Sequence, residues 1–223
     1  MRSNQTYVIQ PSASSASISA VLRNTYLLLS LTLLFSSAVA AYAMTLQPSF
    51  SVSIITFILS FVLLFATTAL RNSAWGIVTV FAFTGCMGFS MGPMLNHFVH
   101  GYSNGHELIL TALGGTGATF LISSAYVLVT KKDLSFLGKF LMIGLVMCII
   151  ASIANIFLKM PAMQLAVSTL LVFISTLLMM FDTSRIIHGG ERNYIMATMS
   201  LFIDILMLFQ NLLTLLGGLN GRN

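Results

Sequence analysis

The sequence predicts an all-α membrane protein with seven transmembrane helices. The first observation is composition, because hydrophobic residues make up 57% of the 223 residues and charged residues only 7%. Soluble domains have about 45–50% apolar and about 25% charged residues, so this composition excludes a soluble fold. The second observation is that seven apolar runs each have about the 20 residues that a helix needs to cross a bilayer.

The elements follow in order along the chain. Residues 1–20 are rich in Ser, Ala and Gln without helical periodicity, so we expect a flexible cytosolic tail. Residues 21–223 form one seven-helix transmembrane domain. We expect Pro93 to end or kink the third helix, because proline removes a backbone donor. The seven spans are expected at 26–45, 52–70, 75–95, 108–129, 137–158, 162–182 and 195–217.

The basic residues predict the orientation. Ten Lys and Arg outnumber five Asp and Glu, but they stand singly or in pairs between apolar runs, so they indicate topology rather than nucleic-acid binding. Eight of them fall on the side of the N-terminus, and only Lys159 and Arg222 fall on the other side. Cytosolic loops are enriched in bases, so these counts predict how the multi-pass protein is oriented in its membrane. Its N-terminus is expected in the cytosol and its C-terminus outside.

The segment 88–92 matches the G-x-S-x-G pattern of serine hydrolases, but it lies inside a predicted membrane helix. That motif works only at a strained strand-to-helix turn with a His base in reach. Two glycines four residues apart are typical of close helix packing in membranes, which is the interpretation that we favour here.

Histidines and cysteines give only weak signals. His97, His100 and His106 have a spacing that allows a weak metal site if a turn of helix aligned them, but a solvated outer loop is the favoured interpretation. Cys86 and Cys148 lie in apolar runs without ligand neighbours, which is typical of core residues.

Asp182 and Asp204 need an explanation, because an ionisable residue inside a membrane segment costs about 2.5–3.5 kcal/mol on insertion scales. Asp182 shares a helix face with Ser168 and Ser175, and Asp204 shares one with Ser200 and Asn211. The short polar connection 185–193 makes the two helices antiparallel neighbours. Asp182 then lies roughly 9 Å and Asp204 roughly 17 Å from that connection, so a modest tilt or unwinding would bring them together.

If the two carboxyl groups meet away from water, we expect them to share one proton and titrate as a unit near neutral pH. The alternative is that Asp182 reaches water at the interface and that Asp204 is a lone structural polar group.

Several segments resemble the Bax inhibitor-one, or transmembrane Bax-inhibitor-motif, family, and in particular its bacterial branch. The resemblance covers nearly all of the chain after residue 20 and is most specific near Asp182 and Asp204. The segments that carry it are 22–26 (LRNTY), 83–85 (FTG), 92–93 (GP), 124–126 (SAY), 131–138 (KKDLSFLG), 181–183 (FDT), 188–195 (HGGERNYI) and 201–205 (LFIDI).

The resemblance implies a bundle in which the seventh helix is central and wrapped by the other six. It also implies that Asp182 and Asp204 form the family's hydrogen-bonded aspartate pair, which couples pH to a calcium-leak path. A basic residue near the end of the second helix pairs with the first aspartate in that family, and Arg71 is the candidate here. The bacterial branch further implies a regulatory contact with a membrane protease of the FtsH type.

Three functions therefore compete. The first is a pH-sensitive, calcium-permeable leak gated by Asp182 and Asp204, which bind calcium weakly in transit because the ion prefers about six to eight oxygens. The second is a regulatory binding protein that modulates an FtsH-type membrane protease. The third, an intramembrane aspartyl protease, is disfavoured because Phe202 and Ile203 replace the Gly-x-Gly that precedes the second aspartate in such enzymes. We expect no cofactor, no catalytic residue and no nucleic-acid partner; the expected partners are the lipid bilayer, calcium ions, protons and a membrane protease complex.

Overall fold

The computed structural model describes residues 15–220, and all the regular elements in that range are helices. Seven helical segments are long and apolar enough to cross a membrane, since α3 and α4 together make one of them, which confirms the predicted fold class. The helices are α1 (Ser15–Leu46), α2 (Phe50–Leu70), α3 (Trp75–Ser90), α4 (Gly92–Gly101), α5 (Gly105–Thr130), α6 (Leu137–Leu158), α7 (Pro161–Ile187) and α8 (Tyr194–Asn220).

The helix boundaries differ from the expected ones mainly at the N-terminus. Helix α1 begins at Ser15, so residues 15–20 are helical although we placed them in the tail; residues 1–14 lie outside the described range. The third span breaks where the sequence predicts it, because α3 ends at Ser90 and Pro93 stands in the first turn of α4. A proline is tolerated in a first turn, where its missing N–H has no intrahelical partner.

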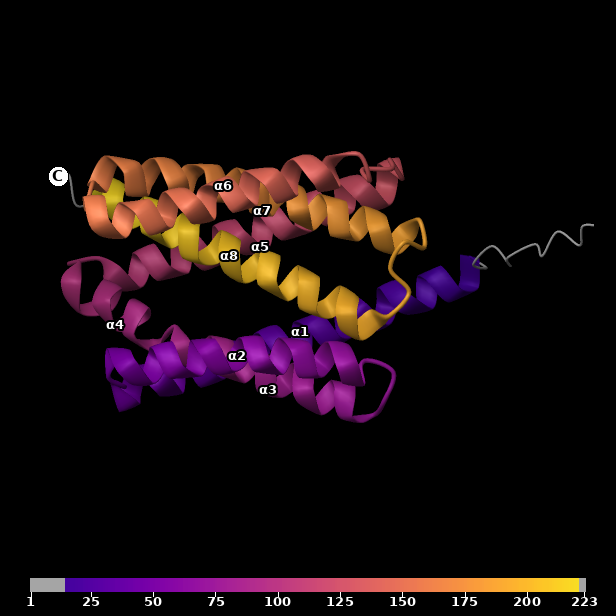
Figure 1. Ribbon diagram of the computed structural model, residues 1–223, viewed down its shortest axis with the longest axis horizontal. Coiled ribbons are helices and arrows are strands. Elements are labelled where there is room, and N and C mark those ends of the chain that lie inside the picture. Colours follow the sequence, from indigo (N-terminus) through magenta and orange to yellow (C-terminus); the bar gives the residue numbers. More distant parts are fainter. Residues whose placement is uncertain (1–14, 221–223) are drawn as a thin grey trace, which may run out of the picture.

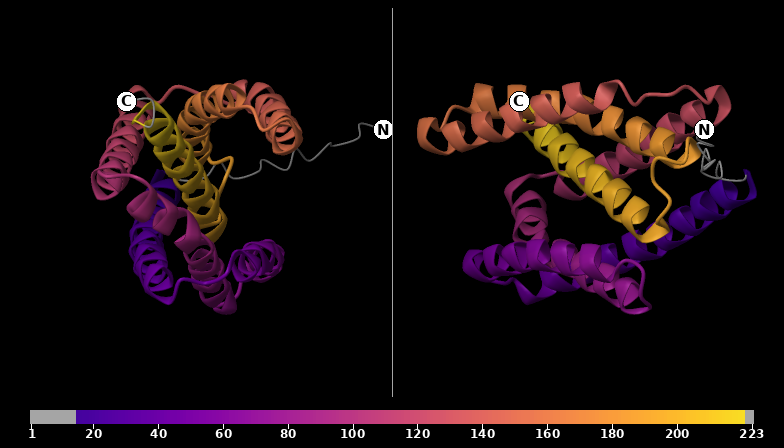
Figure 2. Two further views of the ribbon diagram at one scale, coloured as in Figure 1. Left: turned by 90° about the vertical axis from the view of Figure 1, so that its left-hand side faces the viewer. Right: turned by 45° about the vertical axis from the view of Figure 1, so that its right-hand side comes forward.

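Helix α8 crosses the bundle diagonally (Figures 1 and 2). Helices α1, α2 and α3 lie on one side of it, and α5, α6 and α7 lie on the other. The main neighbours of α8 are α7, α1, α5 and α3, whereas α2 packs chiefly on α3 and α6 packs on α7. The last helix is therefore not wrapped by all six others as expected: α7, α1 and α5 contact α8 extensively, α3 contacts it less, and α2 and α6 form outer flanks.

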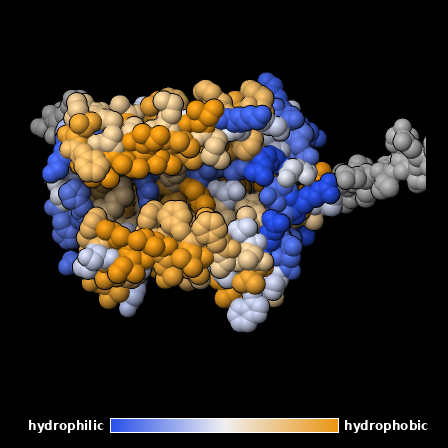
Figure 3. Space-filling model, viewed as in Figure 1, coloured by the Kyte–Doolittle hydropathy of each residue, from blue (hydrophilic) through white to orange (hydrophobic). Residues whose placement is uncertain are grey.

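The core is built around α8, which has the largest buried share of the seven spans. Phe202 is fully buried and meets Phe83 of α3 edge to face, with ring centroids 5.8 Å apart. By contrast, α6 and α2 have the smallest buried shares. Their side chains form apolar bands on the surface (Figure 3), as expected for helices that face lipid.

Helix α1 closely approaches both α3 and α4 at the two glycines of the G-x-S-x-G segment, Gly88 in α3 and Gly92 in α4. A Cβ at Gly88 would collide with the Ser36 carbonyl oxygen, and one at Gly92 would lie 2.8 Å from the Ala43 Cβ. The Ser90 hydroxyl donates to the Met87 carbonyl of its own helix. These residues pack helices together, as small residues do in membranes.

Candidate functional site

Asp182 of α7 and Asp204 of α8 lie with their carboxyl groups within hydrogen-bonding reach of each other. Asp204 is only 5% exposed, and its buried Oδ2 has no hydrogen-bond partner among residues 15–220. A hydrogen bond between two carboxyl groups requires a proton on one of them, since two carboxylates are both acceptors. The two carboxyl groups can therefore bond to each other only when the pair holds a proton.

The tilt of α8 brings the two residues together. Counted along the helices, Asp182 lies five residues before the end of α7, about 7.5 Å, whereas Asp204 lies ten residues after the start of α8, about 15 Å. Helix α8 begins away from the end of α7 and crosses the bundle diagonally (Figure 1), so part of its length runs across the bundle rather than along it. The tilt of α8, and not an unwinding of the helix, compensates for the difference between these two distances, because α8 is helical throughout this region.

Arg185 is the cation of the site. Its Nη1 lies 3.3 Å from Asp182 Oδ1, and its Nη2 lies 3.7 Å from Glu191 Oε2. The side chain of Asp182 is 12% exposed and that of Arg185 is 37% exposed, so the guanidinium connects the buried carboxylate to the surface of the bundle. Arg185 stands three residues after Asp182 on the same helix face, a spacing typical of a side-chain pair, although the sequence was interpreted only as placing this base on the cytosolic side.

Arg71 has a different environment in this structure. It caps the C-terminus of α2 and is exposed, and its carbonyl accepts a hydrogen bond from Asn193 Nδ2 at 3.0 Å. Within residues 15–220, the ion pair of Asp182 is with Arg185. The gating role that the resemblance implies for Arg71 stays a prediction.

The end of α7, next to the site, is hydrogen-bonded to the loop between α5 and α6. The buried Ser184 hydroxyl donates to the Lys132 carbonyl at 3.0 Å and accepts from the Leu134 N–H at 3.0 Å. The His188 ring lies between the Ser184 carbonyl at 2.9 Å and the Lys131 carbonyl at 3.2 Å. These contacts hold the C-terminal turn of α7, just beyond Asp182, to the α5–α6 loop.

Asn193 begins helix α8 and ties it to the turn between α2 and α3. Its side-chain oxygen accepts hydrogen bonds from the backbone N–H groups of Ile195 and Met196, as an N-cap residue does. Its amide nitrogen donates to Arg71 and Asn72, both at 3.0 Å. Gly189 adopts φ 72°, a left-handed conformation that glycine reaches without strain, and so ends α7. The start of α8 is thus held by hydrogen bonds both to its own first turn and to the turn between α2 and α3.

A resident metal centre has little support in the described residues. No group of three or more His, Cys, Asp or Glu side chains gathers there around a common point. His97 and His100 lie on α4, where His97 packs edge to face against Phe98 and the His100 ring bonds to the Asn96 carbonyl. The aspartate pair supplies two carboxyl groups, fewer than the about six to eight oxygens that a calcium ion prefers.

Comparisons with known proteins agree with this arrangement. The family model described as inhibitor of apoptosis-promoting Bax1 matches residues 18–221. The chain belongs to the Bax inhibitor family. This confirms the resemblance drawn from the segments around Asp182 and Asp204.

Relatives in this family come from several bacteria. The chain is 46% identical over 197 residues to a protein of Escherichia coli K12 named modulator of FtsH protease YccA, which covers 88% of this chain and 89% of the relative. The same identity and coverage hold for a protein of Escherichia coli O6:H1 named inner membrane protein YccA. An uncharacterized protein of Pseudomonas aeruginosa, PA2604, is 44% identical over 205 residues, 92% of each chain.

Proposed function

We propose that this chain is a regulatory protein of the inner membrane that binds and modulates a membrane protease of the FtsH type. The observation that carries this proposal is the 46% identity to the protease modulator of Escherichia coli, because it extends over 88% of this chain and 89% of that protein. The relative named inner membrane protein supports the same location.

The distribution of bases supports a cytosolic N-terminus. Seven of the eight Lys and Arg in residues 15–220 belong to the end of the bundle that holds the start of α1 and the α5–α6 and α7–α8 connections. Hydrophilic residues gather at that end of the molecule (Figure 3). The eighth, Lys159, lies at the opposite end. Because bases are retained in the cytosol, the proposal places the first end there and Lys159 outside.

Copurification tests the contact with the protease. Tagged full-length chain, expressed with a proteolytically inactive FtsH-type protease of the same host, should retain that protease after mild solubilisation. A chain lacking residues 1–14 tests the tail. Two matched substitutions test the two lipid-facing flanks as contact surfaces for the protease: Ile150→Trp on α6 and Ile58→Trp on α2. They are matched because these side chains are 61% and 58% exposed. Failure to recover the protease with the full-length chain, even after cross-linking in the membrane, would contradict the proposal.

A second candidate function is a pH-sensitive, calcium-permeable leak, which is compatible with the first. It is favoured by the contact of Asp182 with Asp204 inside the span and by the unpartnered Oδ2 of Asp204. With one shared proton, a hydrogen bond ties α7 to α8; with both groups ionised, repulsion separates them and leaves Asp182 to a cation. Arg185 is in place for that role, and Arg71 is the second candidate. Such a two-state element is what a gate requires.

Calcium flux into liposomes that hold only this protein tests the leak across a range of pH. Asp182→Asn and Asp204→Asn keep the shape but remove a shared proton, so each should flatten the pH dependence of flux. The double substitution should add little, because the two residues act as a unit. Asp133→Asn is the matched control, since Asp133 lies outside the spans. Native-like pH dependence in either single variant would place the sensor elsewhere.

A further inference from the structure

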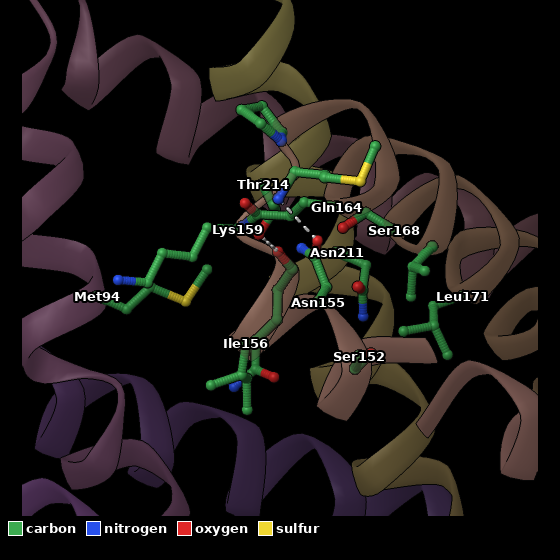
Figure 4. A pocket seen from close by; sticks show the side chains of 14 residues that line it. Met94, Ser152, Asn155, Ile156, Lys159, Gln164, Ser168, Leu171, Asn211 and Thr214 are labelled. Atoms are coloured by element: carbon green, nitrogen blue, oxygen red, sulfur yellow. Dashed lines mark hydrogen bonds between the residues drawn. The ribbon is translucent and has the colours of Figure 1, made fainter. Parts of the chain in front are cut away.

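A second polar site lies at the end of the bundle opposite the aspartate pair. It is a cavity of about 660 Å³ between α4, α6, α7 and α8 (Figure 4). Lys159, which joins α6 to α7, lies at its edge, and Ser168 lies about two turns inside α7. Asp182 stands near the other end of α7, so the cavity is separate from the site described above.

The lining of this cavity is rich in hydrogen-bond donors and holds one positive charge. Lys159 makes no ion pair in the described part of the chain, and no described carboxylate lines the cavity. The side chains of Gln164 and Gln210 have no hydrogen-bond partner among residues 15–220. Asn155 uses its oxygen to accept the Met160 N–H and keeps its amide N–H groups free. Free donors around a lysine favour an anion.

The most buried hydroxyl in the lining, that of Ser168, is a second and independent indication of a ligand. Ser168 is 5% exposed and has no hydrogen-bond partner among the described residues, although its helix offers carbonyl groups to neighbouring hydroxyls such as that of Thr169. The N-terminus of the 27-residue α7 opens beside the same space, and Pro161 stands in its first turn. The first N–H groups of a helix have no intrahelical acceptor and attract anions such as phosphate.

The cavity is bounded by apolar side chains on its lipid-facing side. Met94 of α4 and Ile156 of α6 form part of its wall (Figure 4). Beside it, Ile156 and Phe157 of α6 are 68% and 81% exposed. Figure 3 shows hydrophilic residues in the hollow between two apolar bands of the surface. A ligand with a phosphate and acyl chains matches this division, because its anion finds donors inside and its chains find the apolar face of α6.

We propose that this cavity binds the phosphate of a membrane lipid headgroup, with Lys159, Gln164 and Ser168 as the contacting side chains. The lipid belongs to the leaflet at the Lys159 end of the bundle. Neither Asp182 nor Asp204 lines this cavity.

Native mass spectrometry of the purified full-length protein tests the proposal with three probes: one complete phospholipid and two molecules that each lack one part of it. Phosphatidylglycerol carries phosphate and acyl chains, diacylglycerol with the same chains lacks the phosphate, and glycerol phosphate lacks the chains. We expect one tightly bound phosphatidylglycerol, and binding at least about tenfold weaker for the other two probes.

Substitutions locate the bound lipid. Lys159→Gln should weaken phosphatidylglycerol binding about tenfold, and Gln164→Glu, which keeps the shape but adds a negative charge, should weaken it at least as much. Lys131→Gln is a matched control, because Lys131 also follows a helix in a left-handed conformation with φ 51°, but at the other end of the bundle. It should leave binding unchanged.

Each contrary result overturns the proposal in a distinct way. If Lys131→Gln weakened phosphatidylglycerol binding as much as Lys159→Gln does, the binding would be explained by the general charge of the surface. Equal binding of diacylglycerol would remove the role of the phosphate. Equal binding of glycerol phosphate would assign the cavity to a soluble anion instead of a lipid.

Discussion

At the scale of the residue, single polar side chains decide how the loops are joined to the helices. Ser184 is the clearest case, because it is 1% exposed and its hydroxyl serves both a carbonyl and an N–H of the α5–α6 loop. Most other hydroxyls in the helices bond only to a carbonyl one turn earlier. Ser175, also on α7 and fully buried, bonds in this way to Leu171.

We expect Ser184→Ala to destabilise the protein by about 1–3 kcal/mol, because it leaves the Leu134 N–H and the Lys132 carbonyl without partners. Thermal unfolding in detergent measures this. Ser175→Ala is the control in the same helix and should cost less, since its carbonyl acceptor keeps its backbone bond. Equal losses of stability in the two variants would show that the Ser184 contacts carry no special weight.

The turn before α6 contains a second residue-scale feature. The Ser135 hydroxyl donates to Asp133 Oδ1 at 2.5 Å, and the Ser135 N–H donates to the same oxygen at 2.9 Å. These two hydrogen bonds, that of the hydroxyl more than that of the N–H, hold the pKa of the Asp133 carboxyl below its ordinary value. A lowered pKa in the folded state means that this stabilisation is present above the pKa of the unfolded chain. It is lost as pH falls through the lower, folded value.

Ser135→Ala should therefore raise the pKa of Asp133 toward its ordinary value, because the alanine keeps only the weaker of the two donors. Carbon-13 NMR of the Asp133 carboxyl group, titrated in micelles, measures the change. Ser152→Ala serves as the control, since the Ser152 hydroxyl bonds to Cys148 in the middle of α6. An unchanged titration of Asp133 in Ser135→Ala would contradict the assigned cause.

At the scale of the element, the close contact between α1 and α3 limits which residues α3 can carry. The Gly88 backbone lies against the Ser36 carbonyl, so an added methyl group has no room unless the helices separate. Other glycines are in open surroundings. A Cβ at Gly114 of α5 would meet nothing within 4 Å.

Gly88→Ala should destabilise the protein by about 1–3 kcal/mol through overpacking. Gly114→Ala should be neutral or slightly stabilising, because alanine is the better helix former by about 1 kcal/mol. Thermal unfolding of the two variants in one detergent gives the comparison. A Gly88→Ala protein as stable as the native one would show that α1 and α3 move apart easily.

At the scale of the whole molecule, the arrangement of seven spans predicts which loops face the cytosol. Lys132 lies at the same end as the α7–α8 connection, and His100 lies at the other end, close to the start of α5. Single cysteines at these two positions, in a background where Cys86 and Cys148 are replaced, report the orientation in intact cells.

A label-impermeant thiol reagent added from outside should modify the cysteine at position 100 and spare the one at position 132. The physical reason is that the bases near Lys132 are retained in the cytosol. Permeabilised cells provide the control, in which both positions should react. Labelling of position 132 but not 100 in intact cells would invert the proposed orientation.

The sequence by itself determined the seven spans, the break at Pro93 and the presence of two acids, Asp182 and Asp204, inside apolar runs. These features are local, because apolar length, a missing backbone donor and a charge inside an apolar run can be recognised without knowing the neighbours. The roles of the two aspartates as pH sensor and ion path stay predictions.

Only the tertiary structure decided what surrounds those residues. Arg185 is the cation beside Asp182. Helix α8 packs mainly on α7, α1 and α5 and less on α3, and the cavity near Lys159 gathers side chains from α4, α6, α7 and α8. Each of these depends on the tilt of α8 and on how distant helices meet. Helix periodicity gives the face on which a residue lies, but the partner of that face is set by packing across the whole bundle.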